Sequence, residues 1–79
     1  MANILFFGRL RDEVGSSILT AELPDGVRDA GGLRSWLGRD HPALLDPSVR
    51  MAVNATFCAA DAPVAEGDEI AFLSPMSGG

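Results

Sequence analysis

Residues 70–79 read IAFLSPMSGG, and this stretch sets what the rest of the chain must build. The apolar run at residues 70–73 predicts a buried strand. Pro75 ends regular pairing, because proline has no N–H to donate to a ladder. The residues after it carry almost no side chain, and the chain closes on two glycines. We therefore expect a final strand that releases a flexible tail over residues 74–79.

The two terminal glycines suit a narrow channel. Glycine lacks Cβ, so Gly78 and Gly79 form a thin thread whose backbone can approach another backbone closely. If extended, the tail from Ser74 to Gly79 spans about 20 Å, far enough to carry the terminal carboxylate into a partner's active site. The alternative interpretation is an ordinary frayed chain end. The tail alone leaves both interpretations open.

The composition predicts one small domain over residues 1–79 without covalent staples. A single cysteine excludes an internal disulfide, and one histidine with one cysteine is too few for a structural zinc site. The fold must therefore hold by packing. No stretch is long and apolar enough to cross a membrane, and no signal peptide precedes the first predicted strand, so we expect a cytoplasmic protein.

The charge balance argues against a nucleic-acid binder. The net charge is −5, with eleven acidic residues against six arginines and no lysine. Phosphate neutralisation needs a basic face, whereas an acidic domain is suited to docking on a basic protein surface. The absence of lysine also leaves no side-chain amine for Schiff-base or acyl chemistry, so the chain could attack its own activated tail only weakly.

The first predicted strand covers residues 3–7 and is apolar on both faces. Alternation places Ile4 and Phe6 on one face, and Leu5 and Phe7 on the other. A strand with two apolar faces is normally covered on both sides, and in so small a domain the second cover can be another protein. This strand therefore indicates a docking surface.

A second predicted strand at residues 16–23 pairs with the first as a hairpin. Residues 9–15 read as a charged connection that closes at a glycine. Arg9 and Arg11 lie in this connection and could pair with a partner, but exposed arginines in a loop are usually solvated.

A single helix is predicted between the two halves of the sheet. Asp29 is its N-cap, and it runs to about residue 39. Its apolar face is formed by Ala30, Leu33, Trp36 and Leu37. Gly31 and Gly32 weaken it by about 1 kcal/mol each, so packing must hold it in place. We assign Trp36 to the core rather than to a binding anchor.

The second half of the chain predicts a compact connector, a hairpin and the last strand. Leu44 is the inward residue of the connector. Residues 51–54 and 56–58 flank a tight bend at Asn54, because asparagine tolerates the left-handed conformation. His41 has no second base, nucleophile or ligand beside it. Cys58 has no basic neighbour to lower its pKa, and we interpret it as a small core residue rather than a nucleophile.

This order of elements predicts an α+β fold of the ubiquitin-like, β-grasp type. The hairpin at the start and the strand at the end must share one mixed sheet, with one main helix packed across it. Placing the last strand beside the first and parallel to it gives a right-handed crossover. The C-terminal Gly-Gly tail then protrudes from a central strand, which favours a functional tail over a frayed one.

Several stretches resemble one known family. They are residues 5–8 (LFFG), 11–15 (RDEVG), 53–54 (VN), 66–72 (EGDEIAF) and 77–79 (SGG). Over essentially its whole length the chain resembles the small, sulfur-carrier subunit of molybdopterin synthase. It departs from the family where Ser74-Pro75-Met76 replaces the usual two prolines and valine, and in the pair Gly31-Gly32. Neither departure touches the terminal chemistry.

The resemblance implies a sulfur-carrying tail. A ubiquitin-activating-like adenylyltransferase would use ATP to join the Gly79 carboxylate to AMP, and a sulfur donor would displace AMP to leave a thiocarboxylate. The chain has neither a phosphate loop nor a GxGxxG motif, so it is expected to bind no cofactor itself. Sulfur would then pass to cyclic pyranopterin monophosphate within a heterotetrameric complex, whose large subunit supplies the main catalytic residues. The resulting dithiolene belongs to the molybdenum cofactor.

The same resemblance and the alternation of the strands assign the site residues. Gly79 carries the reactive carboxylate and Gly78 precedes it in the channel. Phe7, Phe57 and Leu73 form the predicted docking patch for the large subunit, since Phe6 and Phe72 take the inward positions. Further partner contacts are expected from Met76 and Ser77, with Asp68 and Glu69 as an acidic rim. No metal, nucleic acid or membrane is expected.

Three other functions remain open at the level of sequence. A sulfur carrier for thiamine thiazole or another metabolite would use the same chemistry with a different acceptor. A ubiquitin-like protein modifier would end in an isopeptide bond from Gly79 to a target lysine. A pure binding module would carry the tail without using it.

Overall fold

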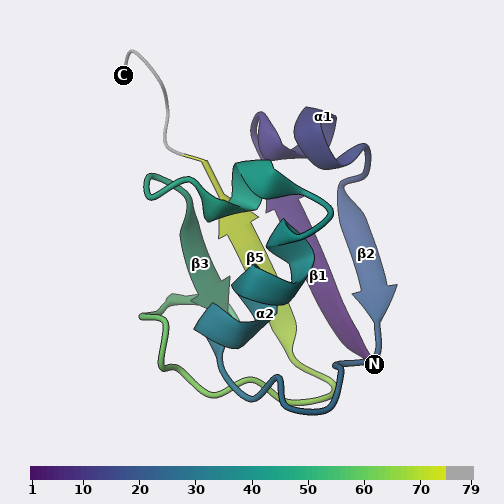
Figure 1. Cartoon of the computed structure of the whole chain (residues 1–79), viewed down its shortest axis with the longest axis vertical. Coiled ribbons are helices and arrows are strands. Elements are labelled where there is room, and N and C mark those ends of the chain that lie inside the picture. Colours follow the sequence, from purple (N-terminus) through teal and green to yellow (C-terminus); the bar gives the residue numbers. More distant parts are fainter. Residues whose placement is uncertain (75–79) are drawn as a thin grey trace.

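The structure, a computed structural model, describes residues 1–74. Its elements follow in the order β1 (Ala2–Phe7), α1 (Leu10–Val14), β2 (Ile18–Ala21), α2 (Ala30–Gly38), the 3-10 turn η1 (Pro42–Leu45), β3 (Arg50–Val53), β4 (Thr56–Phe57) and β5 (Glu69–Leu73). The strands form one mixed sheet, and α2 and η1 lie across one face of it (Figure 1). The predicted α+β arrangement is confirmed.

The first and last strands lie side by side at the centre of the sheet. The strand order is β2-β1-β5-β3-β4, and β1 runs parallel to β5 with Phe6 opposite Phe72 and Phe7 opposite Leu73. Strands β2 and β3 pair antiparallel on the two outer sides of this central pair. The prediction that the last strand lies parallel beside the first is therefore confirmed. Both strands end at the edge of the sheet from which the chain continues into Ser74.

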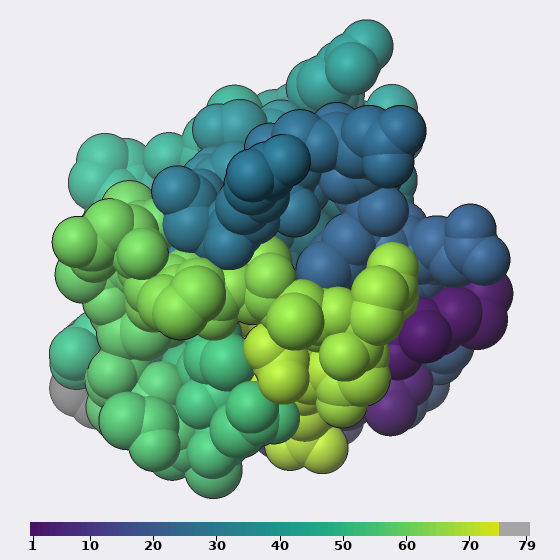
Figure 2. Space-filling view, turned by 90° about the horizontal axis from the view of Figure 1, so that it is seen from below, coloured from purple at the N-terminus to yellow at the C-terminus, as the bar shows by residue number. Residues whose placement is uncertain are grey.

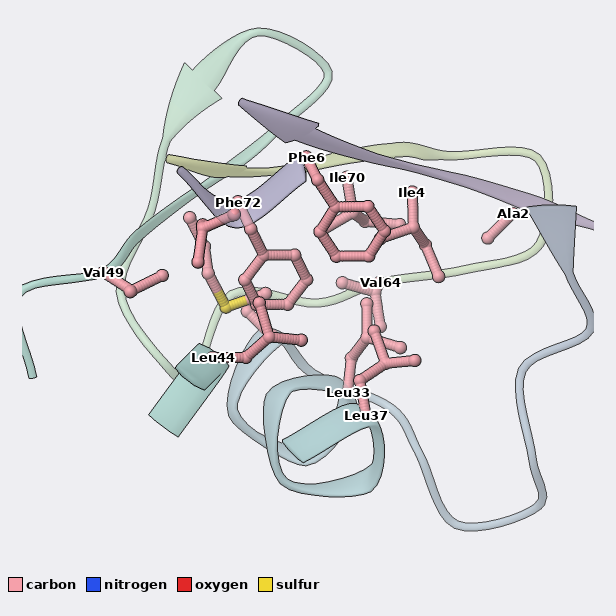
Figure 3. Packing of buried hydrophobic residues seen from close by; sticks show 13 residues of the cluster. Ala2, Ile4, Phe6, Leu33, Leu37, Leu44, Val49, Val64, Ile70 and Phe72 are labelled. Carbon is pink, nitrogen blue, oxygen red and sulfur yellow. The ribbon is translucent and has the colours of Figure 1, made fainter. Parts of the chain in front are cut away.

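The core lies between the sheet and α2. The Phe6 and Phe72 rings stack with centroids 5.8 Å apart and an interplanar angle of 15° (Figure 3). Leu33 and Leu37 meet them from α2, and Leu44 from η1, as the sequence predicted. Trp36 is partly buried and packs against the same cluster. Burying a large apolar side chain contributes roughly 1.5–3 kcal/mol, so this cluster supplies most of the folding free energy.

The pair of glycines in α2 has a structural reason. The Gly31 N–H donates to the Ala60 carbonyl oxygen at 2.8 Å, and a Cβ on Gly31 would lie 3.1 Å from the Ala60 Cβ. Gly31 thus lets the loop of residues 58–68 approach the helix, and Figure 2 shows this green loop against the blue start of α2. The Gly32 N–H donates to the Asp29 carboxylate at 2.7 Å, which confirms the predicted N-cap.

The charged connection between the first two strands closes at Gly15 as predicted, but it contains a helix that the sequence did not predict. It folds into the short helix α1, because Leu10 is buried in the core and holds the segment against the sheet. Gly15 then ends α1 in the left-handed region, with φ of 88°, and its N–H donates to the Arg11 carbonyl oxygen. Strand β2 is consequently shorter than expected, although it pairs antiparallel with β1 as predicted.

The predicted bend between β3 and β4 is confirmed. Asn54 and Ala55 both have positive φ, 49° and 70°. The Asn54 side chain also joins the hairpin to β5, because its amide oxygen accepts from the Glu69 N–H at 3.0 Å. The Asn54 N–H in turn donates to the Glu69 carbonyl oxygen at 2.7 Å, so the bend is tied to β5 by two hydrogen bonds.

The N-terminus is clamped by one carboxylate. Glu66 accepts from the Leu23 N–H at 2.9 Å, and its other oxygen lies 3.3 Å from the Met1 ammonium group. The hydrogen bond from Leu23 is the main reason why the pKa of Glu66 is held below its ordinary value, and the Met1 ammonium adds to it. The ionised form of Glu66 therefore joins the start of β1 to the loops at this end of the sheet.

We predict that this clamp stabilises the fold only while Glu66 is ionised. Because folding lowers the pKa of Glu66, its contribution is present above the ordinary pKa of 4.5 and is lost as pH falls below it. Glu66→Gln should melt at a lower temperature than the native chain at pH 7, and the difference should shrink at pH 3. Glu22→Gln removes an equal charge from an exposed carboxylate and serves as the control. A pH-independent difference would contradict the assignment.

Candidate functional site

Within residues 1–74, one face of the sheet is not covered by a helix. Because side chains alternate along a strand, the residues opposite to the buried Phe6 and Phe72 point away from α2. We call this surface the outer face; it consists of Asn3, Leu5, Phe7, Ile18, Thr20, Arg50, Ala52, Phe57, Glu69, Ala71 and Leu73.

A continuous apolar row crosses the outer face from one edge of the sheet to the other. The strand register places one residue of each strand in line, in the order Ile18, Leu5, Ala71, Ala52 and Phe57. The two ends of the row are the most exposed, with Ile18 at 50% and Phe57 at 55%. Such a row on a small domain is typical of a protein-binding surface.

The outer face is polarised along the strands. Beyond the apolar row, toward Ser74, lies a second row formed by Phe7, Leu73 and Arg50. On the other side of the apolar row lie Thr20 and Asn3, whose side chains bond to each other at 3.0 Å, and Glu69. The apolar surface is therefore concentrated at the end of the sheet from which the tail departs.

The structure places the three predicted docking residues on this face. Phe7 is 47% exposed and is paired with the partly buried Leu73 on the neighbouring strand. Phe57 lies at the far end of the apolar row, under the Arg50 guanidinium. Docking by these residues stays a prediction, and the register extends the patch to Leu5, Ile18 and Ala71. Alternation had already placed Leu5 on the same face as Phe7, but only the register joins Ile18 and Ala71 to them, because alternation does not say which strands are neighbours.

Of the two residues of the predicted acidic rim, Glu69 lies on the outer face beside the apolar row, but Asp68 does not. The Asp68 carboxylate accepts from the Ala65 N–H at 2.9 Å and from the Asn54 side-chain amide at 3.2 Å, so it holds the turn before β5. Glu69 lies on the outer face, but at the polar end beside Asn3. Local hydrogen bonding, which the sequence pattern does not reveal, decides the place of Asp68.

The start of the tail is closely packed against the end of β1. Gly8 has φ of 63°, and a Cβ there would lie 2.8 Å from the Ser74 Oγ. A glycine at this position therefore lets Ser74 lie beside the end of β1. The predicted site residues Met76, Ser77, Gly78 and Gly79 lie outside the described residues.

Cys58 is not activated as a nucleophile. Its thiol donates to the Met51 carbonyl oxygen, with Sγ and oxygen 3.7 Å apart, and the residue packs against the core. Burial raises the pKa of the Cys58 thiol, and the negative charge of Asp61 raises it further. Because the thiolate is the reactive form, this environment opposes thiol chemistry at neutral pH.

The described residues offer few other chemical groups. Across residues 1–74, no three His, Cys, Asp or Glu side chains gather in a way that could hold a metal ion. Within the same range, no helix is both long and apolar enough to span a membrane. Neither Cys58 nor His41 is part of such a cluster, so the outer face and the tail that begins beside it are the candidate site.

We predict that Cys58 reacts slowly with thiol reagents in the folded chain. At pH 7.5 its alkylation by iodoacetamide should be several-fold slower than that of N-acetylcysteine amide, which has no free carboxylate, because the raised pKa lowers the thiolate fraction. The same chain unfolded in urea should react at about the rate of this small thiol. A folded-state rate at or above that of N-acetylcysteine amide would contradict this environment.

Comparison with known proteins finds relatives over the whole length of the chain, including its last residues. The model of the ThiS family matches residues 4–79. The molybdopterin synthase sulfur carrier subunit of Escherichia coli is 33% identical over 81 residues, which cover 100% of both chains.

Solved structures show the same architecture. SAMP1 from Haloferax volcanii superposes with a TM-score of 0.81 at 26% identity, over 99% of this chain and 98% of that one. One chain of the complex of subunits 1 and 2 of the molybdopterin-converting factor from Helicobacter pylori superposes with a TM-score of 0.67 at 21% identity, over 99% of this chain and 97% of that one. At this identity the likeness shows the fold alone. The chain therefore belongs to the ThiS family, and its curated relatives are sulfur carrier subunits of molybdopterin synthase.

Proposed function

We propose that this chain is the sulfur carrier subunit of molybdopterin synthase and that it carries sulfur on Gly79. The observation that supports this most is its full-length match to sulfur carrier subunits, which includes the terminal Gly78 and Gly79. The geometry agrees with the role, because a carrier must present its terminal group beside a surface to which a partner can bind.

The parallel pairing of β1 and β5 supplies that arrangement. It brings Phe7 next to Leu73, the last residue of β5, so the apolar end of the outer face and the start of the tail lie together. A partner that covers this end can receive the tail at the same time. From Ser74 the remaining residues can reach about 17 Å if extended.

The chemistry at Gly79 needs a second protein for activation. A carboxylate is a poor acyl donor, so its oxygen first attacks the α-phosphorus of ATP; pyrophosphate leaves and an acyl adenylate forms. Hydrosulfide from a sulfur donor then attacks the carbonyl carbon; AMP leaves as the C–S bond forms, and loss of the S–H proton gives the thiocarboxylate. Cys58 has a raised pKa and lies in the fold, which is consistent with a sulfur donor supplied from outside.

The large subunit is the proposed recipient. The thiocarboxylate sulfur attacks a carbon of cyclic pyranopterin monophosphate and displaces an oxygen substituent from it, which leaves a thioester between Gly79 and the precursor. Water then cleaves the acyl C–S bond, so the precursor keeps the sulfur and the Gly79 carboxylate is restored. Two such transfers supply the two sulfurs of the dithiolene. The acid–base groups for these steps are assigned to the large subunit, as the family resemblance implies; on this chain Arg9, Glu13 and Asp46 line a pocket together with Ser74.

A protein modifier is the second candidate. It is favoured by the likeness to SAMP1, the small archaeal modifier protein 1 of Haloferax volcanii, at 26% identity and a TM-score of 0.81. A modifier forms an isopeptide bond from Gly79 to a lysine of another protein, so lysates would contain conjugates of higher mass. A carrier would give only the free chain and its thiocarboxylate.

We predict that Gly79 becomes a thiocarboxylate. Incubation of the purified chain with ATP, the cognate adenylyltransferase and a sulfur source should raise its intact mass by the difference between one sulfur and one oxygen atom. A chain that lacks Gly78 and Gly79 should show no such change and should not support molybdenum cofactor synthesis in cells. Cofactor synthesis by the shortened chain would remove the proposed function.

We predict that Phe7→Asp weakens binding to the large subunit by about tenfold or more, because it places a charge in a desolvated apolar contact. Binding is measured by isothermal titration calorimetry. Leu45→Asp is the matched control: Leu45 is 49% exposed against 47% for Phe7, but it lies on η1, on the covered side of the sheet. Equal effects of the two variants would contradict docking through the outer face.

A further inference from the structure

Arg50 occupies an unusual place for a charged residue. It begins β3 on the outer face and is paired with Leu73, which is in turn paired with Phe7. Its guanidinium carbon lies 4.3 Å from the centroid of the Phe57 ring. This cation–π contact holds the guanidinium over the Phe57 ring beside the apolar surface, while the residue stays exposed to solvent.

The guanidinium has no acceptor of its own in the described part of the chain. The one ion pair there joins Met1 to Glu66, and no side-chain hydrogen bond involves Arg50. Arg34, by contrast, donates to the carbonyl oxygens of Leu44 and Asp46 and is used by the fold. Arg50 also is the one cation among the outer-face residues defined above. Stacking on a ring leaves the N–H groups at the edge of the guanidinium free to donate.

Covering this surface with a purely apolar partner would be costly. The partner would remove water from a guanidinium that has no counter-charge, and a desolvated unpaired charge is strongly unfavourable. A carboxylate on the partner would avoid that cost, since it can accept two parallel N–H bonds from the planar fork. If Phe7 and Leu73 dock against a partner, the partner residue that faces Arg50 must therefore carry a negative charge.

We propose that Arg50 determines partner specificity: the large subunit that covers the outer face presents an aspartate or glutamate to its guanidinium. This inference rests on the proposed function and names the chemistry of its partner surface. The chain as a whole has a net charge of −5, so long-range attraction favours a basic partner. A single contact of the opposite sign within the apolar patch therefore fixes the orientation of docking and disfavours surfaces without an acidic residue at that point.

The test compares Arg50→Met with Arg39→Met in the full chain. Both remove one positive charge from an exposed arginine, but Arg39 follows α2 and lies away from the outer face. Isothermal titration against the purified large subunit should show affinity lower by about tenfold or more for Arg50→Met, because the partner's carboxylate is left unpaired. Arg39→Met should change it less than about twofold. Thermal melting of each variant confirms that the fold is intact.

Two results would overturn the inference. The first is an Arg50→Met chain that binds as well as or better than the native chain, as expected if an apolar surface faces Arg50. The second comes from replacing the large subunit's interfacial carboxylates with amides, one at a time. One of these replacements should weaken binding of the native chain but should not weaken binding of the Arg50→Met chain any further. If no replacement behaves in this way, the proposal is contradicted. No binding by the native chain would instead remove the proposed partner, and this inference with it.

Discussion

The stacked rings of Phe6 and Phe72 join the first strand to the last, and the rest of the structure depends on that contact. They sit opposite each other in the parallel β1–β5 pair, where α2 covers them. A parallel pair needs a crossover connection, so everything between the two strands is committed to closing this unit. The pairing has a direct functional consequence: the outward neighbours Phe7 and Leu73 also become partners, at the point where the chain leaves the sheet.

Size explains why one face of the sheet stays uncovered. The chain is only 79 residues long, and in its described part α2 is the longer of two helices; it can bury only one side of a five-stranded sheet. The other side keeps an apolar row from Ile18 to Phe57. The short chain therefore leaves an apolar surface next to the tail, and this surface is suited to a protein partner.

The two ends of the outer face serve different needs. Thr20 and Asn3 satisfy each other at the polar end, where Asp68 and Asn54 secure the turn and hairpin. The end near Ser74 is apolar and carries the charge of Arg50, held by Phe57. On this face the hydrogen-bonded side chains thus lie far from the tail, whereas the exposed Phe7 and Arg50 lie close to it.

Much of the fold could be predicted because its causes are local. Alternation placed Phe6 and Phe72 inward, and the side chain of Asp29 caps α2 as its position before an apolar helical pattern indicated. The prediction was wrong for α1, whose sequence is mostly charged; one buried residue, Leu10, converts it from a connection into a helix. A single apolar residue in a charged run gives no periodicity to detect.

By itself, then, the sequence determined the identity of the elements, the inward residues and the small-residue tail, since each follows from the spacing or chemistry of neighbouring residues. Only the tertiary structure decided the strand register that aligns Ile18, Leu5, Ala71, Ala52 and Phe57, the engagement of Asp68 in its turn, and the position of Arg50 over an aromatic ring. These depend on contacts between residues far apart in the chain, and such contacts exist only once the sheet has closed.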